Sequence, residues 1–126
     1  MKEKKVGIID YGFGNLFSVK SAIKELNHKP IISDKYKELA KCDKLILPGV
    51  GAFGDAMNCI IKKKIDSTIY ELVLNKKIDI LGICLGFQLL GKSSNEMGTF
   101  KGLNLINFKI ENLKKKKNWF IPHIGW

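Results

Sequence analysis

The chain has 126 residues, of which 45% are hydrophobic and 27% are charged, a balance typical of one globular domain. No run is apolar over the roughly 18 positions that a membrane-spanning helix requires. The N-terminal segment is too short and too quickly interrupted to be a signal peptide. We therefore expect a cytoplasmic protein with no membrane partner.

The formal net charge of +10 raises the question of nucleic-acid binding. Every basic side chain is a lysine, whereas proteins that recognise bases and phosphates rely on the planar fork of arginine. The lysines are also scattered in separate groups along the chain. We interpret them as solvated surface residues and expect no nucleic-acid partner.

The first two-thirds of the chain alternates short β-type runs with helical patterns, which predicts a mostly parallel sheet built from βαβ units. Strands are expected at residues 5–9, 30–33, 44–47 and 79–83. Helices are expected at residues 16–26, 55–63, 66–75 and 85–92. Asn15 is placed to cap the first of these helices. The expected fold is a three-layer α/β sandwich with a flavodoxin-like outline.

The character of the sequence changes after Gly98. Residues 100–110 have weaker periodicity and are expected to form strands or a hairpin. A polar loop at residues 114–118 is followed by the apolar, aromatic segment 119–126. Since natural domain ends are usually polar, we expect residues 1–126 to be the N-terminal portion of a domain whose C-terminal part is missing.

The strongest chemical signal surrounds Cys84. A buried strand runs into this cysteine, which has a glycine two residues before it and another two residues after it. This G-x-C-x-G pattern is that of a nucleophile elbow, in which the turn is too sharp to accept side chains at the glycine positions. A cysteine at the N-terminus of the following helix also lies at the positive end of its dipole, which favours the thiolate. The alternative is a buried cysteine between two incidental glycines.

The other two cysteines, Cys42 and Cys59, lie in a polar loop and on an expected helix, without such a pattern. Three cysteines without metal-like spacing indicate neither a disulfide framework nor a zinc site. We therefore expect reduced thiols, no metal and no cofactor.

A second glycine-rich turn, residues 47–54, follows the expected third strand. Because ligand sites in open α/β sheets form outside the carboxyl ends of the strands, this turn and Cys84 are expected at the same edge of the sheet. Backbone N–H groups exposed by its glycines could stabilise an oxyanion, as could the N–H of Leu85. The alternatives are a flexible connection or a phosphate cradle, but no Gly-Lys-Ser/Thr follows as in a P-loop.

Four motifs occur in order, and together they carry a resemblance. They are Asp10–Leu16, Leu47–Gly54, Gly82–Gln88 and Pro122–Trp126. In these motifs the chain resembles the glutaminase subunits of imidazole glycerol phosphate synthase, which are class I (triad) glutamine amidotransferases. The resemblance covers essentially all 126 residues.

The resemblance implies the roles of several residues. Cys84 would attack the side-chain amide of glutamine, release ammonia and form a glutamyl thioester. The turn around Gly49, Val50 and Gly51 would supply the oxyanion hole with the N–H of Leu85, and Gln88 would lie near the bound glutamine. The partner would be a (β/α)₈-barrel cyclase subunit, which receives the ammonia and forms a heterodimer with this subunit. The residues on the side of this partner would be Asn15, Pro122, His123 and Trp126.

The chain departs from the family at the catalytic base, because members supply a histidine and a glutamate from a later segment. Of its two histidines, His28 is expected at the surface and His123 belongs to the partner-facing motif. Neither inherits the role of base. Loss of a triad member lowers the rate by orders of magnitude, so the 126-residue chain alone is expected to be inactive.

Three readings stay open. The chain is part of a glutaminase of histidine biosynthesis, part of a paralogue that supplies ammonia for amino-sugar synthesis on surface polysaccharides, or a non-catalytic remnant that binds a partner. The motifs do not separate the first two readings.

Overall fold

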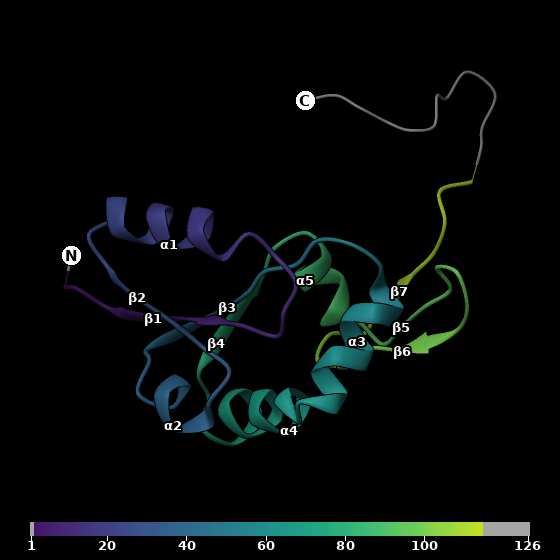
Figure 1. The fold of residues 1–126 in the computed structure, drawn as a ribbon. Coiled ribbons are helices and arrows are strands. Elements are labelled where there is room, and N and C mark those ends of the chain that lie inside the picture. The colour runs from purple at the N-terminus through teal and green to yellow at the C-terminus, as the bar shows by residue number, and fades with distance from the viewer. Residues whose placement is uncertain (1, 115–126) are drawn as a thin grey trace.

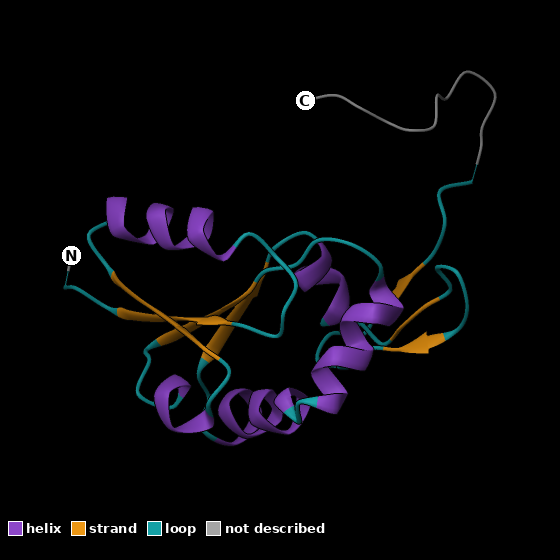
Figure 2. Cartoon of the chain, viewed as in Figure 1, coloured by secondary structure: helices purple, strands orange, loops and turns teal. Residues whose placement is uncertain are grey.

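The computed structural model describes residues 2–114 and has a four-stranded parallel sheet at its centre (Figures 1 and 2). The strands are β1 (Lys5–Ile9), β2 (Lys29–Ser33), β3 (Lys44–Leu47) and β4 (Asp79–Gly82), in the order β2-β1-β3-β4. Parallel strands need crossover connections, which the helices between them provide. The strands predicted from the sequence are confirmed, with boundaries shifted by at most one residue.

Helices lie on both sides of this sheet. They are α1 (Leu16–Glu25), α2 (Tyr36–Leu39), α3 (Phe53–Lys62), α4 (Ile65–Tyr70) and α5 (Leu85–Leu89), with the π-helix η1 (Glu71–Asn75) continuing α4. Figure 1 shows α1 on one side of the strands and α2 and α4 on the other. The predicted three-layer α/β arrangement is therefore confirmed. The single turn α2 was not predicted, because four residues are too few to show helical periodicity.

Successive residues of β1 face opposite sides of the sheet and belong to two different cores. Ile9 is buried in the larger core, which contains Phe53 and Ile60 of α3. Ile8 is buried in the smaller core, where it packs with Ile23 of α1. This alternation follows from the two-residue period of a strand with both faces covered.

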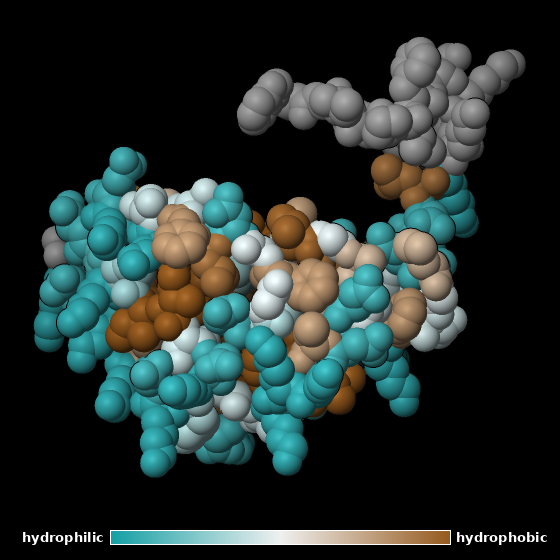
Figure 3. All heavy atoms as spheres, viewed as in Figure 1, coloured by the Kyte–Doolittle hydropathy of each residue, from teal (hydrophilic) through white to brown (hydrophobic). Residues whose placement is uncertain are grey.

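The face of the sheet that carries α1 is covered unevenly. Val6 and Ile8 are buried beneath α1, but Leu81 of β4 is 58% exposed. Val6, Ile46 and Leu81 line an apolar groove of about 250 Å³, and the salt bridge between Lys44 and Asp79 lies at its rim. Figure 3 shows hydrophobic surface beside α1. The β4 end of this face therefore has no helix of residues 2–114 packed over it.

A second, small sheet follows α5. Its strands are β5 (Ser93–Ser94), β6 (Phe100–Lys101) and β7 (Lys109–Ile110), in the order β6-β5-β7. β6 is antiparallel to β5, whereas β7 is parallel to it. The strands expected in residues 100–110 are confirmed, but they do not pair with each other, so the hairpin alternative is wrong.

The same segment explains why α5 ends before its predicted boundary at residue 92. The carbonyl oxygens of Leu89, Leu90 and Gly91 accept hydrogen bonds from backbone N–H groups of residues 103–106. The N–H of Lys92 donates to the carbonyl of Phe108, whereas a helix that reached residue 92 would direct it to the carbonyl of Gln88. The chain between β6 and β7 thus caps α5 instead of forming a tight turn.

Candidate active site

Cys84 occupies a strained turn between β4 and α5. Its backbone has φ 54° and ψ −117°, a conformation that residues with a side chain rarely adopt. The N–H of Ile83 donates to the carbonyl of Leu47 on β3, and the N–H of Gly86 donates back to the carbonyl of Ile83. These bonds hold the turn at the carboxyl end of the sheet, where the Cys84 side chain is exposed. Backbone strain of this kind is typical of functional sites.

The two glycines that flank Cys84 are required by close packing. A methyl group on Gly82 would lie 2.6 Å from the backbone nitrogen of Phe87, and one on Gly86 would lie 2.6 Å from the carbonyl carbon of Leu47. Such contacts with backbone cannot be relieved by moving a flexible side chain. The pattern around Cys84 therefore forms a steric elbow and is not incidental.

The glycine-rich turn lies against this elbow. A methyl group on Gly49 would lie 2.8 Å from the N of Gly86 and 3.0 Å from Cβ of Leu85. Gly49 is buried, whereas Val50 and Gly51 are exposed. Among residues 2–114, no hydrogen-bond acceptor is found for the N–H groups of Gly49, Val50, Gly51 and Leu85. The structure thus brings together the turn and the elbow, as expected for the carboxyl edge of a parallel sheet.

Tyr11, which the sequence analysis did not single out, lies beneath this turn. Its side chain is fully buried, its ring stacks on Phe13, and its hydroxyl donates a 2.7 Å hydrogen bond to the carbonyl of Pro48. Burial, together with the nearby Cys84 sulfur, raises the pKa of Tyr11 well above its usual value. The hydroxyl therefore keeps its proton and remains a donor at neutral pH.

The far end of the turn is also held by a distant side chain. Ala52, the N-cap of α3, provides no capping side chain, and the N–H of Phe53 instead donates a 3.0 Å hydrogen bond to Oε2 of Glu96. Glu96 comes from the loop between β5 and β6. Residues 48–53 are thus anchored at both ends by side chains that lie elsewhere in the sequence.

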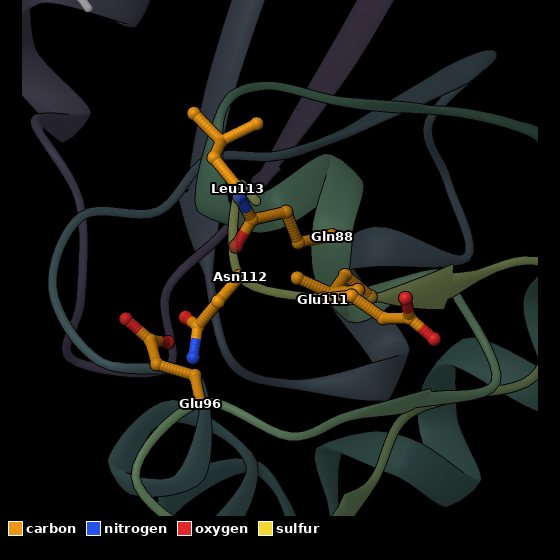
Figure 4. A pocket seen from close by; sticks show the side chains of 6 residues that line it. Gln88, Glu96, Glu111, Asn112 and Leu113 are labelled. Atoms are coloured by element: carbon orange, nitrogen blue, oxygen red, sulfur yellow. The ribbon is translucent and has the colours of Figure 1, made fainter. Parts of the chain in front are cut away.

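Gln88 lies one helical turn after Cys84 and faces an open pocket of about 500 Å³ (Figure 4). The lining residues are Gln88, Glu96, Ile110, Glu111, Asn112 and Leu113. Glu96 therefore reaches both the pocket and the glycine-rich turn. No local pattern in the sequence marks Glu96, since it lies within a short polar loop.

The remaining site predictions fall on two parts of the chain. Asn15 is exposed, and its Oδ1 accepts a hydrogen bond from the N–H of Ser18, which confirms it as the N-cap of α1. Pro122, His123 and Trp126 lie outside the described residues. His28, between α1 and β2, accepts a hydrogen bond from the N–H of Lys4 and lies far along the chain from the elbow.

Residues 2–114 show neither a metal cluster nor a membrane-spanning helix. No cluster of three or more histidine, cysteine, aspartate or glutamate side chains could hold a metal ion there. None of the helices described is long and apolar enough to cross a membrane.

Comparison with protein families matches residues 8–119 to the CobB/CobQ-like glutamine amidotransferase domain. Among curated proteins, the chain is 44% identical over 125 residues to "Imidazole glycerol phosphate synthase subunit HisH" of Bacillus velezensis, covering 96% of this chain. It is 49% identical over 122 residues to the protein of the same name from Prochlorococcus marinus, covering 97% of this chain. The chain spans only 58% and 57% of the length of these two relatives.

A solved structure described as "Crystal structure of glutamine amidotransferase" has a similar fold, with a TM-score of 0.72 and 22% sequence identity. The similarity covers 84% of this chain and 55% of that one. At this identity the similarity shows the α/β fold alone.

Proposed function

Because this chain belongs to the family of CobB/CobQ-like glutamine amidotransferase domains, we propose that it is part of an enzyme that hydrolyses glutamine to glutamate and ammonia. The observation that carries the proposal is the elbow: an exposed cysteine held at a positive φ between two glycines that nothing larger can replace. Free cysteines in ordinary turns lack this geometry.

In the proposed reaction, the Cys84 thiolate attacks the carbon of the glutamine side-chain amide. The carbonyl π electrons move to oxygen. The C–N bond of the resulting tetrahedral intermediate then breaks as nitrogen receives the proton that the Cys84 thiol gave up to the catalytic base, and nitrogen leaves as ammonia. Water then attacks the glutamyl thioester, giving glutamate and restoring the thiol. Both steps pass through an anionic oxygen that needs hydrogen-bond donors.

The donors that we assign to this oxygen are backbone N–H groups at the elbow and on the glycine-rich turn. Leu85 contributes the first N–H of α5, and Gly49, Val50 and Gly51 contribute theirs from the turn. The proposal is supported by the contact of Gly49 with Leu85 and Gly86 and by the absence of acceptors for these groups among residues 2–114.

The pocket beside Gln88 is our candidate for the amino-acid end of glutamine. Free glutamine carries an α-ammonium group and an α-carboxylate besides its reactive amide. The side-chain amide of Gln88 can donate or accept hydrogen bonds, and the carboxylate of Glu96 complements an ammonium group. The volume of this pocket, about 500 Å³, is within the range for small-molecule sites.

We further propose that residues 1–126 form the N-terminal portion of the domain and that a later segment supplies the triad histidine and glutamate. The relatives are longer than this chain, and the apolar groove along Leu81 has the character of a surface that packs against more protein. The 126-residue chain alone is then inactive, because Cys84 lacks its base.

The partner in this proposal is the (β/α)₈-barrel cyclase subunit of imidazole glycerol phosphate synthase, which would take up the ammonia in histidine biosynthesis. It is supported by the names of the relatives, each described as a subunit of that synthase. Exposed Asn15 would face this partner in a heterodimer, together with Pro122, His123 and Trp126. We also propose that the protein acts in the cytoplasm, as expected from the sequence.

An affinity-labelling experiment tests the assignment of Cys84. The full-length protein with its cyclase subunit is incubated with a glutamine analogue that carries an electrophile at the side-chain carbonyl position. We expect the label on Cys84 by peptide mass spectrometry, with protection by excess glutamine and not by excess asparagine. Labelling elsewhere, or labelling that glutamine does not slow, would contradict the assignment.

A further inference from the structure

Aromatic and glycine contacts tie the turn at residues 10–15 to the turn at residues 48–51. Tyr11 donates to the carbonyl of Pro48, and a methyl group on Gly14 would lie 3.2 Å from the nitrogen of Gly49. Phe13 stacks on Tyr11 and lies against Gly51. Of these contacts, only the bond from Tyr11 fixes the direction of a backbone polar group.

The direction of the Pro48 carbonyl also determines the direction of the Gly49 N–H, because the two groups belong to one planar peptide bond. A peptide bond to glycine is trans, so the carbonyl of Pro48 and the N–H of Gly49 point in opposite directions. With the carbonyl held by the Tyr11 hydroxyl, the N–H of Gly49 must point away from the Tyr11 side. Gly49 itself packs against Leu85 and Gly86, the first residues after Cys84.

We propose that Tyr11 is a positioning residue, whose hydroxyl holds the Pro48–Gly49 peptide in one orientation beside Cys84. This inference rests on the proposed function, since the orientation affects catalysis only if backbone N–H groups of the turn bind the oxyanion. Without the hydroxyl, a buried carbonyl loses its partner and the peptide can rotate. Glycine at position 49 has no side chain to resist such a rotation.

The chain offers a matched control for the loss of this hydroxyl. Tyr70 of α4 also donates to a backbone carbonyl, that of Leu103, over 2.9 Å. Tyr11→Phe and Tyr70→Phe each delete one oxygen and one tyrosine-to-carbonyl hydrogen bond. A purely structural contribution of Tyr11 therefore predicts similar effects of the two variants.

The kinetic test uses the full-length protein with its cyclase subunit and glutamine as substrate. We expect Tyr11→Phe to lower kcat for ammonia release by about tenfold or more with KM changed less than about twofold, because transition-state binding is lost. Tyr70→Phe should leave both constants within about twofold of wild type. Equal kcat values for the two variants would overturn the proposal.

A second readout does not depend on activity. Relaxation dispersion of the Gly49 backbone amide should report exchange between peptide orientations on the μs–ms timescale in Tyr11→Phe, and no such exchange in wild type or Tyr70→Phe. If wild type releases no ammonia, the proposed function fails, while this measurement still decides the role of Tyr11. The absence of such exchange in Tyr11→Phe would refute that role.

Should Tyr11→Phe not fold, wild type provides the decisive measurement. The hydroxyl proton of Tyr11 should exchange slowly enough to be seen by NMR and show a cross-peak to Gly49. If the hydroxyl proton of Tyr11 exchanges as fast as the hydroxyl proton of a solvent-exposed tyrosine, the proposal is contradicted.

Discussion

The last residue of β4, Gly82, lies directly against the backbone of Phe87 in α5. Together with the contact of Gly86 on Leu47, this leaves no room for a side chain on either side of Cys84. The strained conformation of Cys84 follows from it, because the chain must reverse between two elements that are in backbone contact. The reactive sulfur is therefore presented by packing, and packing defects should disturb it.

Gly86→Ala should be strongly destabilising. The added methyl group meets the backbone of β3, and we expect a loss of about 3 kcal/mol or more in the free energy of unfolding. Gly7→Ala is the control, since its methyl group meets only the ends of the Leu39, Cys42 and Leu45 side chains. Urea denaturation measures both variants. A smaller loss for Gly86→Ala than for Gly7→Ala would contradict the packing described for the elbow.

Two substitutions at Glu96 separate its two contacts. Glu96→Gln keeps an oxygen that can accept the hydrogen bond from Phe53, so its stability should remain close to wild type. Glu96→Ala leaves the N-terminus of α3 uncapped, so its free energy of unfolding should be lower by about 1 kcal/mol. If the carboxylate binds the α-ammonium group of glutamine, both variants of the full-length enzyme should have a raised KM. Chemical denaturation and steady-state kinetics measure the two effects. An unchanged KM in Glu96→Gln would contradict the proposed contact between Glu96 and the substrate.

Tyr11 should make the stability of the protein fall at high pH. The folded state holds the proton of Tyr11 more tightly than the unfolded chain, in which a tyrosine has its usual pKa of 10.0. The stabilisation is thus complete below pH 10 and decreases above it, by up to about 1.4 kcal/mol per pH unit. Because lysines also titrate there, the measurement is the difference between wild type and Tyr11→Phe in urea denaturation at pH 8 and pH 11. An equal loss in both proteins would contradict the burial of this hydroxyl.

Leu81→Lys tests whether more protein packs on the apolar groove beside β4. In the 126-residue chain Leu81 is 58% exposed, so a lysine there should change stability by less than about 0.5 kcal/mol. In the full-length protein the same substitution should cost about 2 kcal/mol or more, because it would bury a charge. Equal effects in the two proteins would indicate that no later segment covers the groove.

Much of this fold could be predicted from the sequence because the signals are local. The strands are short apolar runs, and the elbow is defined by glycines within two residues of Cys84. The contacts that hold the glycine-rich turn are not local: Tyr11 bonds Pro48 across 37 positions, and Phe53 bonds Glu96 across 43. Sequence periodicity does not reveal such pairs, so the contacts of Tyr11 and Glu96 are visible only in the structure.

The small sheet shows the same limit. Its strands have two residues each, too few for an alternating pattern, and their pairing depends on how residues 103–106 bond to the end of α5. The roles of Gly49, Val50, Gly51, Leu85 and Gln88 remain predictions, as does the orientation of Asn15 toward a partner.

The role of Cys84 is tested most directly by ammonia release from glutamine by the full-length protein bound to its cyclase subunit, with Cys84→Ala and Cys59→Ala compared with wild type. Cys59 is a partly buried thiol on α3 and serves as the matched control. We expect Cys84→Ala to lower kcat by about a thousandfold or more, as for other deleted nucleophiles, and Cys59→Ala to retain wild-type activity. Ammonia release by Cys84→Ala at the wild-type rate would contradict the assignment of the nucleophile to this elbow.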